Sequence, residues 1–403
     1  MRETLVIREH NEREYDLSQD QVAVLEADFS KEVQLTPMRD PKRFLIRVSS
    51  SVGFIQLPGD LTLAIRSKIP AESILYLLML VYDPDKKIFR PEEQHFSTFE
   101  GIFEFVVQEF VRHVEDLIAG GILRNYQQKE DDLIMIRGKL QITETLRRHP
   151  AVRDRHWCQY SRLTPDICEN KIIKSTILQL KNYSYQRLDL RSRIRRLERA
   201  FIDVAQEIDS LDLFDDLEYH RLNDHYRPAL GLARILLENI TFSGSVGSES
   251  FLSFLINMDW LFEKVIETYL KRWKHAELKV VGQRKESLDH GSQVKVKPDV
   301  TLLRGRSPVF AVDAKYKLDP DQKDIYQILA YCHALGIGEA ALAYPMSENM
   351  PQGKLFIREP GNVGISYVPI DLSGAPQEIE ANAEIFINRI SQLIPYETIA
   401  SVE

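Results

Sequence analysis

The sequence predicts a mixed α/β protein with a β-rich N-terminal module, a mainly helical middle and a C-terminal α/β domain. Three observations support this fold class. Short apolar runs separated by turn residues fill the first 70 residues. Apolar residues then recur about every 3.6 positions up to residue 240. After a Gly- and Ser-rich stretch, helix and strand patterns alternate. We therefore expect domains at 1–70, 71–240 and 251–403.

Composition excludes several classes of protein. With 403 residues, 44% of them hydrophobic and 28% charged, the chain suits two or three globular domains. Its longest apolar run, Ile74–Val81, is far shorter than the roughly 20 residues of a membrane-spanning helix. The charged start, MRETLVIREHNE, is unlike a signal peptide. Cys158, Cys168 and Cys332 form no CxxC pair, which argues against a disulfide framework or a structural zinc site. We expect a cytoplasmic protein without membrane contact.

The N-terminal module is expected to contain short paired strands. Alternating apolar residues predict strands at Arg43–Val48, Gly53–Leu57 and Leu61–Ile69. Pro58, Gly59 and Asp60 separate the last two runs and favour a tight turn.

The middle segment combines helical periodicity with a concentration of basic residues. We expect helices from Ala71 onward, up to Gly120, at 170–184, at Leu188–Ile208 and at Leu230–Ile240. Residues 137–199 contain 16 Lys or Arg against 6 Asp or Glu, although the whole chain has a net charge of −8. This segment is either a solvated basic face or a surface for a polyanion, which we expect to be DNA or an acidic partner.

The C-terminal part is expected to begin after a flexible boundary at Thr241–Ser250. A core-facing helix then follows over Phe251–Trp273, with Glu263 and Glu267 one turn apart. The remaining expected elements are strands at Leu278–Val281, Val294–Leu303 and Val309–Lys315, a helix at Asp321–Leu335, a strand at Ala340–Tyr344, strands near Leu355 and Ile365, and a helix at Ala383–Leu393.

The stretch KPDVTLLRGRSPVFAVDAKYK carries charges beside its most apolar strands. Asp313 and Lys315 should share a face because side chains alternate along a strand. If the strands pair through the turn at Arg304–Ser307, Asp299 and Asp313 converge. Two carboxylates beside a lysine suit Mg²⁺, which would polarise a phosphodiester, while Lys315 positions water or neutralises charge. The structural alternative is an Asp–Lys salt bridge at a sheet edge.

This pattern resembles the PD-(D/E)xK nuclease superfamily. A Pro-Asp pair is followed, after thirteen residues, by Asp-x-Lys behind the apolar run VFAV. The resemblance implies a restriction-endonuclease-like α/β/α domain. It also implies that Asp299 and Asp313 bind Mg²⁺ and that Lys315 assists the nucleophile.

Two flanking helices extend the resemblance. Gln327 and Tyr331 match the QxxxY element of several such nucleases. This match implies that Gln327 orients the site or contacts DNA. The preceding helix stands where the superfamily often supplies one more acidic residue, and spacing leaves open whether Glu263 or Glu267 has that role.

Further segments resemble the McrC family, the nuclease subunits of the McrBC modification-dependent restriction system. They are GFIQLPGDLTLAIRSKI, IRGKLQITETLRRH, ENKIIKSTILQL, VDAKYK and DIYQILAY, which with gaps span Phe44–Leu335 in the family's order. The resemblance implies a DNA endonuclease that works with a hexameric AAA+ GTPase recognising methylated cytosine. The N-terminal half would dock on that ring and stimulate GTP hydrolysis. GTP would bind the partner, in agreement with the lack of a GxxxxGK[ST] loop here.

Two other functions stay open. One is a non-catalytic adaptor of an AAA+ ring, in which the acidic–lysine cluster is only structural. The other is a stand-alone nuclease of the same fold. Cleavage of both strands of double-stranded DNA would favour pairing with a second copy of the chain.

Overall fold

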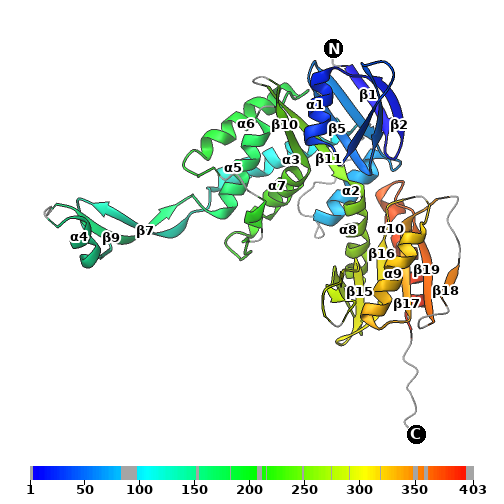
Figure 1. The fold of residues 1–403 in the computed structure, drawn as a ribbon. Helices are drawn as coiled ribbons and strands as arrows, with labels where there is room; N and C mark the ends of the chain where they lie inside the picture. The colour runs from blue at the N-terminus through cyan, green and yellow to red at the C-terminus, as the bar shows by residue number, and fades with distance from the viewer. Residues whose placement is uncertain are drawn as a thin grey trace, which may run out of the picture. The chain divides into compact units, whose positions relative to one another are not determined.

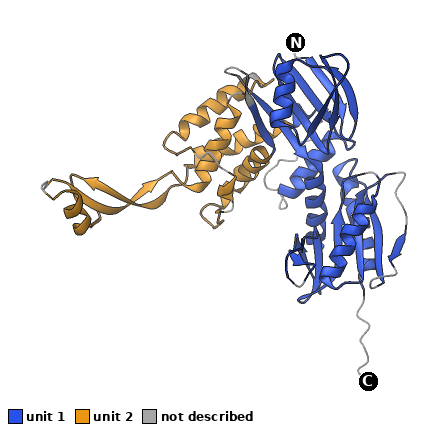
Figure 2. Cartoon of the chain, in the orientation of Figure 1, with its two compact units in different colours: residues 1–86, 91–102, 239–403 blue, residues 87–90, 103–238 orange. Residues whose placement is uncertain are grey.

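The computed structural model describes residues 3–82, 98–150, 154–181, 183–206, 211–214, 216–246, 249–273, 275–289, 291–317, 319–347, 353–357 and 362–395. It divides into two compact units (Figure 2). Unit 1 comprises residues 1–86, 91–102 and 239–403, and unit 2 comprises residues 87–90 and 103–238. The mixed α/β fold class is confirmed. The three-domain division stays a prediction.

The first part of unit 1 is a β-rich module in which two sheets and one helix enclose a core (Figure 1). The larger sheet has the order β1-β6-β5-β11-β10, with β1 (Glu3–Arg8), β5 (Ser51–Leu57), β6 (Leu61–Arg66), β10 (Ile240–Val246) and β11 (Glu249–Asn257). The smaller sheet has the order β2-β4-β3, with β2 (Glu12–Asp16), β3 (Val33–Pro37) and β4 (Arg43–Val48). The strands predicted near residues 43, 53 and 61 are confirmed.

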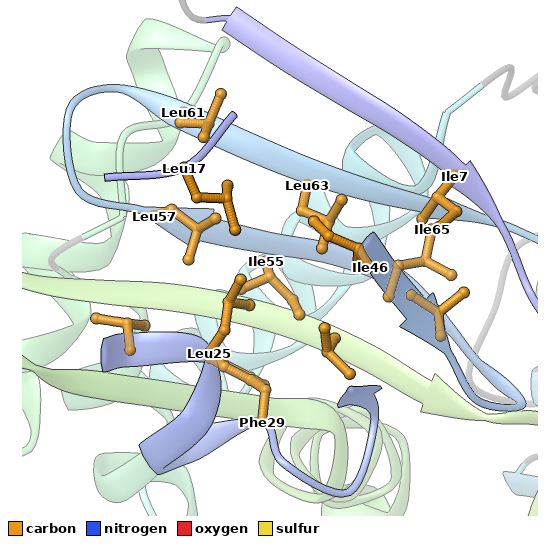
Figure 3. Close-up of a cluster of buried hydrophobic side chains, with 13 residues drawn as sticks. Ile7, Leu17, Leu25, Phe29, Ile46, Ile55, Leu57, Leu61, Leu63 and Ile65 are labelled. Atoms are coloured by element: carbon orange, nitrogen blue, oxygen red, sulfur yellow. The ribbon is translucent and has the colours of Figure 1, made fainter. Parts of the chain in front are cut away.

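Alternation along these strands explains the core of the module. Every second residue of β6 turns inward, so Leu61, Leu63 and Ile65 meet side chains from the other sheet and from α1 (Gln19–Asp28), including Leu25 (Figure 3). A capping box between Ser18 and Gln21 starts α1.

The loop predicted at 241–250 is wrong where the structure describes it. Residues 240–246 and 249–257 pair as antiparallel strands β10 and β11, and residues 247–248 lie outside the described residues. β11 also pairs with β5, where Gly53 opposes Leu255. A Cβ at Gly53 would come within 2.0 Å of the carbonyl oxygen of Phe254, so only glycine permits this approach. Strand pairing satisfies the backbone hydrogen-bonding groups of this segment. Its Gly and Ser content alone does not predict that pairing.

The helix predicted from Phe251 begins only at Met258, because residues 249–257 form β11. A short apolar run of this kind is compatible with a helix or a strand, and this one forms a strand because it pairs with β5. Asn257 caps the resulting α8 (Met258–Arg272) by accepting the Trp260 N–H.

The second part of unit 1 contains a six-stranded sheet of order β12-β15-β16-β17-β19-β18. Its strands are β12 (Leu278–Gly282), β15 (Val300–Arg304), β16 (Ser307–Ala314), β17 (Glu339–Pro345), β18 (Lys354–Ile357) and β19 (Val363–Ile370). Helices α8, α9 (Gln322–Leu335) and α10 (Pro376–Leu393) pack against it, and α2 (Ala71–Tyr82) contacts α8. β16 and β17 are parallel, so α9 serves as their crossover connection.

The predicted hairpin is confirmed and one strand boundary is corrected. Val300 pairs with Val312, and Arg304 pairs with Ser307 across a turn where Gly305 has a φ of 64°. The expected strand 294–303 is broken, because β14 (Lys295–Val296) pairs with β13 (Glu286–Ser287) instead and β15 starts at residue 300. Pro298 explains the break, since proline supplies no N–H to a sheet ladder. The predicted final helix is present but begins at Pro376.

Unit 2 combines helices with a three-stranded arm. The helices are α3 (Phe99–Gly120), whose first turn belongs to unit 1, α4 (Ile142–Arg148), α5 (Cys168–Leu180), α6 (Leu188–Ala200) and α7 (Arg227–Asn239), with single turns at Asp212–Phe214 and Asp224–Tyr226. The arm is formed by β7 (Asn125–Leu133), β8 (Lys139–Leu140) and β9 (His156–Thr164) in the order β7-β9-β8. β7 and β9 project away from α5, α6 and α7, and α4 packs against β9 at the end of the arm (Figure 1).

Two expectations for this unit need correction. The helix expected at Leu188–Ile208 ends at Ala200, and Ile208 lies outside the described residues. The arm was not predicted, because β7 (NYQQKEDDL) is polar and mostly exposed, without the apolar alternation of a half-buried strand. No helix in the described part of the chain is long and apolar enough to cross a membrane.

Candidate functional site

The predicted acidic residues meet at one end of the β15–β16 hairpin. Asp299 lies directly before β15, and the pairing of Val300 with Val312 brings it opposite Asp313. The Oδ2 atom of Asp299 accepts a hydrogen bond of 2.8 Å from the backbone N–H of Ala314. The turn therefore fixes both carboxylates in register, as the sequence predicted.

Asp313 is fully buried and shares one lysine with Asp299. The Nζ atom of Lys315 lies 2.8 Å from Oδ2 of Asp313, so both side chains lie on the same face of the strand end. Burial and the charge of Asp299 raise the pKa of Asp313 well above its ordinary value, although Lys315 opposes this rise. Lys315 can balance one negative charge, so the raised pKa of Asp313 reflects the cost of a second charged carboxylate in the cluster.

Lys315 is held in its charged form. Burial alone would lower its pKa, but the charges of Asp313 and Asp299 outweigh burial and raise it. Its backbone N–H donates to the carbonyl of Ala343 in β17 at 2.8 Å. The lysine therefore stands at a fixed place where β16 ends.

Glu263 and Glu267 occupy different environments although they lie one turn apart on α8. Burial and the charge of Asp299 raise the pKa of Glu263 to about 7, and Lys315 works against this rise. Glu263 is therefore electrostatically part of the cluster.

The negative charge of Glu267 is balanced by two lysines of the same helix. Its carboxylate pairs with Lys264 at 2.7 Å and Lys271 at 2.6 Å, and these bonds lower its pKa against the opposing effect of burial. It also lies over Gly282 of β12, where a Cβ would come within 1.9 Å of its Oε1. Glu267 has the contacts of a structural residue.

Among the described residues, Gln327 is linked to the cluster through Tyr331. The Gln327 side chain is exposed, and its Nε2 donates a hydrogen bond to the Tyr331 hydroxyl. Burial and the charge of Asp313 raise the pKa of Tyr331 to about 12. Tyr331 therefore borders the cluster, and sequence reasoning left it out of the candidate site although the i, i+4 pair had marked it.

The donor set suits a hard cation that keeps much of its hydration. Both carboxylate oxygens of Asp313 are buried, and Oδ1 has no hydrogen-bond partner among the described residues. The described part of the chain contains no group of three or more His, Cys, Asp or Glu side chains arranged as a metal site. Two carboxylates are nevertheless a sufficient protein contribution for Mg²⁺, which retains waters and binds substrate phosphates.

Comparison with known proteins supports one family. The family model of McrBC 5-methylcytosine restriction system components matches residues 46–345. No curated protein matches the chain.

Two solved structures are similar to the chain. One is a refined half-complex from a tetradecameric assembly of Thermococcus gammatolerans McrB AAA+ hexamers with bound McrC. That likeness has 18% sequence identity and a TM-score of 0.57, and covers 96% of this chain and 100% of that chain. The other is the cryo-EM structure of the T. gammatolerans McrBC complex, with 20% identity, coverage of 68% and 89%, and a TM-score of 0.43, which is too low to support a shared fold. At 18% identity, the first likeness indicates a common fold.

Proposed function

The chain belongs to the family of McrBC 5-methylcytosine restriction system components, and from this premise we propose that it is the DNA-cleaving subunit of such a system. Its reaction would be Mg²⁺-dependent hydrolysis of phosphodiesters in double-stranded DNA that carries methylated cytosine. The observation that carries the proposal is the meeting of the half-buried Asp299 with the fully buried Asp313, which pairs with Lys315.

Each residue of the cluster has a proposed role. Asp299 and Asp313 would hold Mg²⁺, which when bound polarises the scissile phosphate and acidifies water. Lys315, held charged beside the carboxylates, would place the attacking water and offset charge developing on the phosphate. Glu263, with its pKa raised to about 7, would accept a proton from that water or join the metal ligands. Gln327 would support the site through Tyr331.

A protein partner is proposed from the family and from the arm. The similar McrC is bound to McrB AAA+ hexamers. In this chain the arm tip, which we define as residues 134–146, exposes large apolar side chains. They are Ile134 at 67%, Met135 at 81%, Ile136 at 56%, Ile142 at 63% and Leu146 at 63%. Such a patch marks a surface for protein rather than for DNA. We propose that the arm tip docks on an AAA+ GTPase ring, which binds the GTP.

Several basic residues of 137–199 form ion pairs within the chain. Arg147 and Arg148 of the arm both bond Glu144, and Arg193 of α6 forms a bidentate pair with Glu115. These pairs reduce the charge available to a polyanion. Whether the remaining charges bind DNA or the ring stays open, and the salt dependence of DNA binding after charge reversal tests this point.

The proposed activity is tested by Asp313→Ala in the full chain with its AAA+ partner, GTP, Mg²⁺ and methylated DNA. We expect cleavage to be lost while stimulation of GTP hydrolysis is retained, because the substitution lies outside the docking surface. Retained cleavage would show that the site is wrong and would favour the non-catalytic adaptor. Cleavage by the purified wild-type chain with DNA and Mg²⁺ alone would favour a stand-alone nuclease.

The docking surface is tested separately by Met135→Asp. A carboxylate in an apolar interface loses its hydration without gaining a partner, so we expect GTPase stimulation to fall at least about tenfold. Ile202→Asp is the matched control, because Ile202 is also an exposed apolar residue of unit 2, at 75%, but lies outside the arm. Equal effects of both substitutions would remove the arm tip as the docking site.

A further inference from the structure

The β-rich module continues directly into the helix that carries Glu263. β11 belongs to the sheet of that module through its pairing with β5, where Asn257 opposes Ser51. The next residue, Met258, begins α8 and donates its N–H to the carbonyl of Ser50 at 3.0 Å. The Ser50 hydroxyl also bonds the side chain of Asp259. The helix that carries Glu263 is thus attached to the module by its first residues.

A second connection from the module reaches Tyr316, the residue after Lys315. It centres on Glu9, which follows β1. Glu9 is completely buried. Its Oε1 accepts hydrogen bonds from the Tyr316 hydroxyl at 2.9 Å, the Lys68 backbone N–H at 2.7 Å and the Ser67 hydroxyl at 3.1 Å. Among the described residues its Oε2 has no hydrogen-bond partner and the carboxylate has no salt bridge with Lys or Arg. Burying a carboxylate this way is costly, so its place calls for an explanation beyond packing.

Tyr316 is the residue directly after Lys315. It is 6% exposed, and its ring lies 6.0 Å from that of Phe262 and 6.5 Å from that of His10, measured between centroids. Burial and the charge of Glu9 raise the pKa of Tyr316, so the hydroxyl keeps its proton and remains a donor. Side-chain hydrogen bonds of the Tyr316 hydroxyl to Glu9 and, at 3.4 Å, with the Ser67 hydroxyl therefore tie the residue beside Lys315 to the N-terminal module.

We propose that Glu9 is a positioning residue for Lys315 and acts through Tyr316. The inference rests on the proposed nuclease function, in which Lys315 faces the phosphate. Lys315 lies beyond the last residue of β16, where the backbone is held by its bond to Ala343 on one side and by the Tyr316 anchor on the other. Without the anchor the lysine would move relative to the carboxylates, and displacement by about 1 Å can slow a reaction roughly 100-fold.

The test is single-turnover cleavage by the full chain with its AAA+ partner, GTP, Mg²⁺ and methylated DNA. Tyr316→Phe keeps the ring packing and removes the hydroxyl that bonds Glu9 and Ser67. Glu9→Leu keeps the approximate volume and removes the acceptor. Glu9→Gln retains a carbonyl oxygen for the Tyr316 hydroxyl and is the rescue variant. Glu12→Gln is the control, because Glu12 is a surface residue of the same module paired with Arg47.

We expect Tyr316→Phe and Glu9→Leu to lower the cleavage rate constant roughly 10- to 100-fold. The reaction amplitude and the affinity for Mn²⁺, used as a metal probe, should stay unchanged, since the carboxylates and the folded fraction are intact. Glu9→Gln should recover most of the rate, and Glu12→Gln should match wild type. A merely structural role would lower the amplitude rather than the rate constant.

Two outcomes separate this inference from the proposed function. If Lys315→Ala abolishes cleavage while Tyr316→Phe keeps the wild-type rate constant, the positioning role of Glu9 is wrong and the nuclease site stands. If Lys315→Ala also cleaves normally, the nuclease site itself is wrong. Loss of amplitude with an unchanged rate constant in Tyr316→Phe and Glu9→Leu would likewise overturn the positioning role.

Discussion

The carboxylates at the end of the β15–β16 hairpin and those on helices α8 and α9 are balanced in different ways. Asp299 and Asp313 share one lysine, and mutual repulsion adds to burial in raising the pKa of Asp313. On α8, Glu267 alone has two lysine partners. On α9, Asp324 pairs with Lys317 at 2.7 Å and accepts a hydrogen bond from the Tyr344 hydroxyl at 2.8 Å.

This difference separates residues that hold the fold from residues available to a ligand. Carboxylates whose charge is balanced by lysines contribute to folding, and their oxygen atoms are already engaged and do not bind a cation. Two neighbouring carboxylates, one of them fully buried, that have one lysine beside them destabilise the metal-free protein and gain most from a bound cation. The four predictions that follow test this separation, from the largest expected effect to the smallest.

The largest effect is expected for Asp313→Asn. Cleavage should fall on the order of 10³-fold, because one charged metal ligand is lost. The metal-free protein should not lose stability, since the amide relieves the repulsion with Asp299. Cleavage assays and denaturant unfolding without metal measure the two effects. A clear loss of stability would place Asp313 among the structural carboxylates.

Glu263→Gln and Glu267→Gln form a matched pair on one helix. Glu263→Gln should slow cleavage roughly 100-fold with little change in stability, because the residue responds to the charge of Asp299. Glu267→Gln should lower the free energy of unfolding by about 1–3 kcal/mol and leave cleavage intact, because it weakens two lysine bonds. The reverse pattern would assign the acidic role to Glu267.

Asp324→Asn should lower the stability of the protein, and the size of this loss should depend on pH. Burial opposes ionisation of Asp324, but Lys317 and other hydrogen bonds outweigh it and lower its pKa. The carboxylate therefore stabilises the fold above its unfolded pKa, roughly 3.9, and this contribution is lost as pH falls through the folded value. We expect Asp324→Asn to cost about 1–3 kcal/mol at neutral pH. Unfolding curves should converge with wild type in acid, whereas a pH-independent cost would contradict the assignment.

The smallest effect is expected for Gln327→Ala. The side chain is exposed and loses one hydrogen bond to Tyr331, so cleavage should fall roughly 2- to 10-fold. Tyr331→Phe, which removes the same bond from the other side, is the matched variant. A loss as large as that of Asp313→Asn would mean that Gln327 contacts the reacting groups directly.

The sequence predicted the C-terminal sheet and the meeting of Asp299, Asp313 and Lys315 well. These features depend on local patterns: alternation along β16, a Gly-containing turn and a short loop that sets the register. Which glutamate of α8 joins the cluster was not predictable from spacing. The structure favours Glu263, because Lys264 and Lys271 pair with Glu267 whereas the pKa of Glu263 responds to the charge of Asp299.

The missed features depend on contacts between distant parts of the chain. Strand β11 forms because β5 offers it a partner some 200 residues away, where Gly53 permits close approach. The same long-range pairing connects the N-terminal module to α8 and brings Glu9 to Tyr316. Strand β7 of the arm is polar and gave no apolar alternation. Local patterns carry no information about such pairings.

The central claim, that Asp299 and Asp313 hold a divalent cation, is tested most directly by calorimetric titration of the full chain with Mn²⁺. Wild type and Glu267→Gln are expected to bind with similar affinity. Asp313→Asn is expected to bind at least roughly tenfold more weakly, because loss of a ligand should exceed the effect of losing a supporting contact. Equal affinity in wild type and Asp313→Asn would contradict the claim.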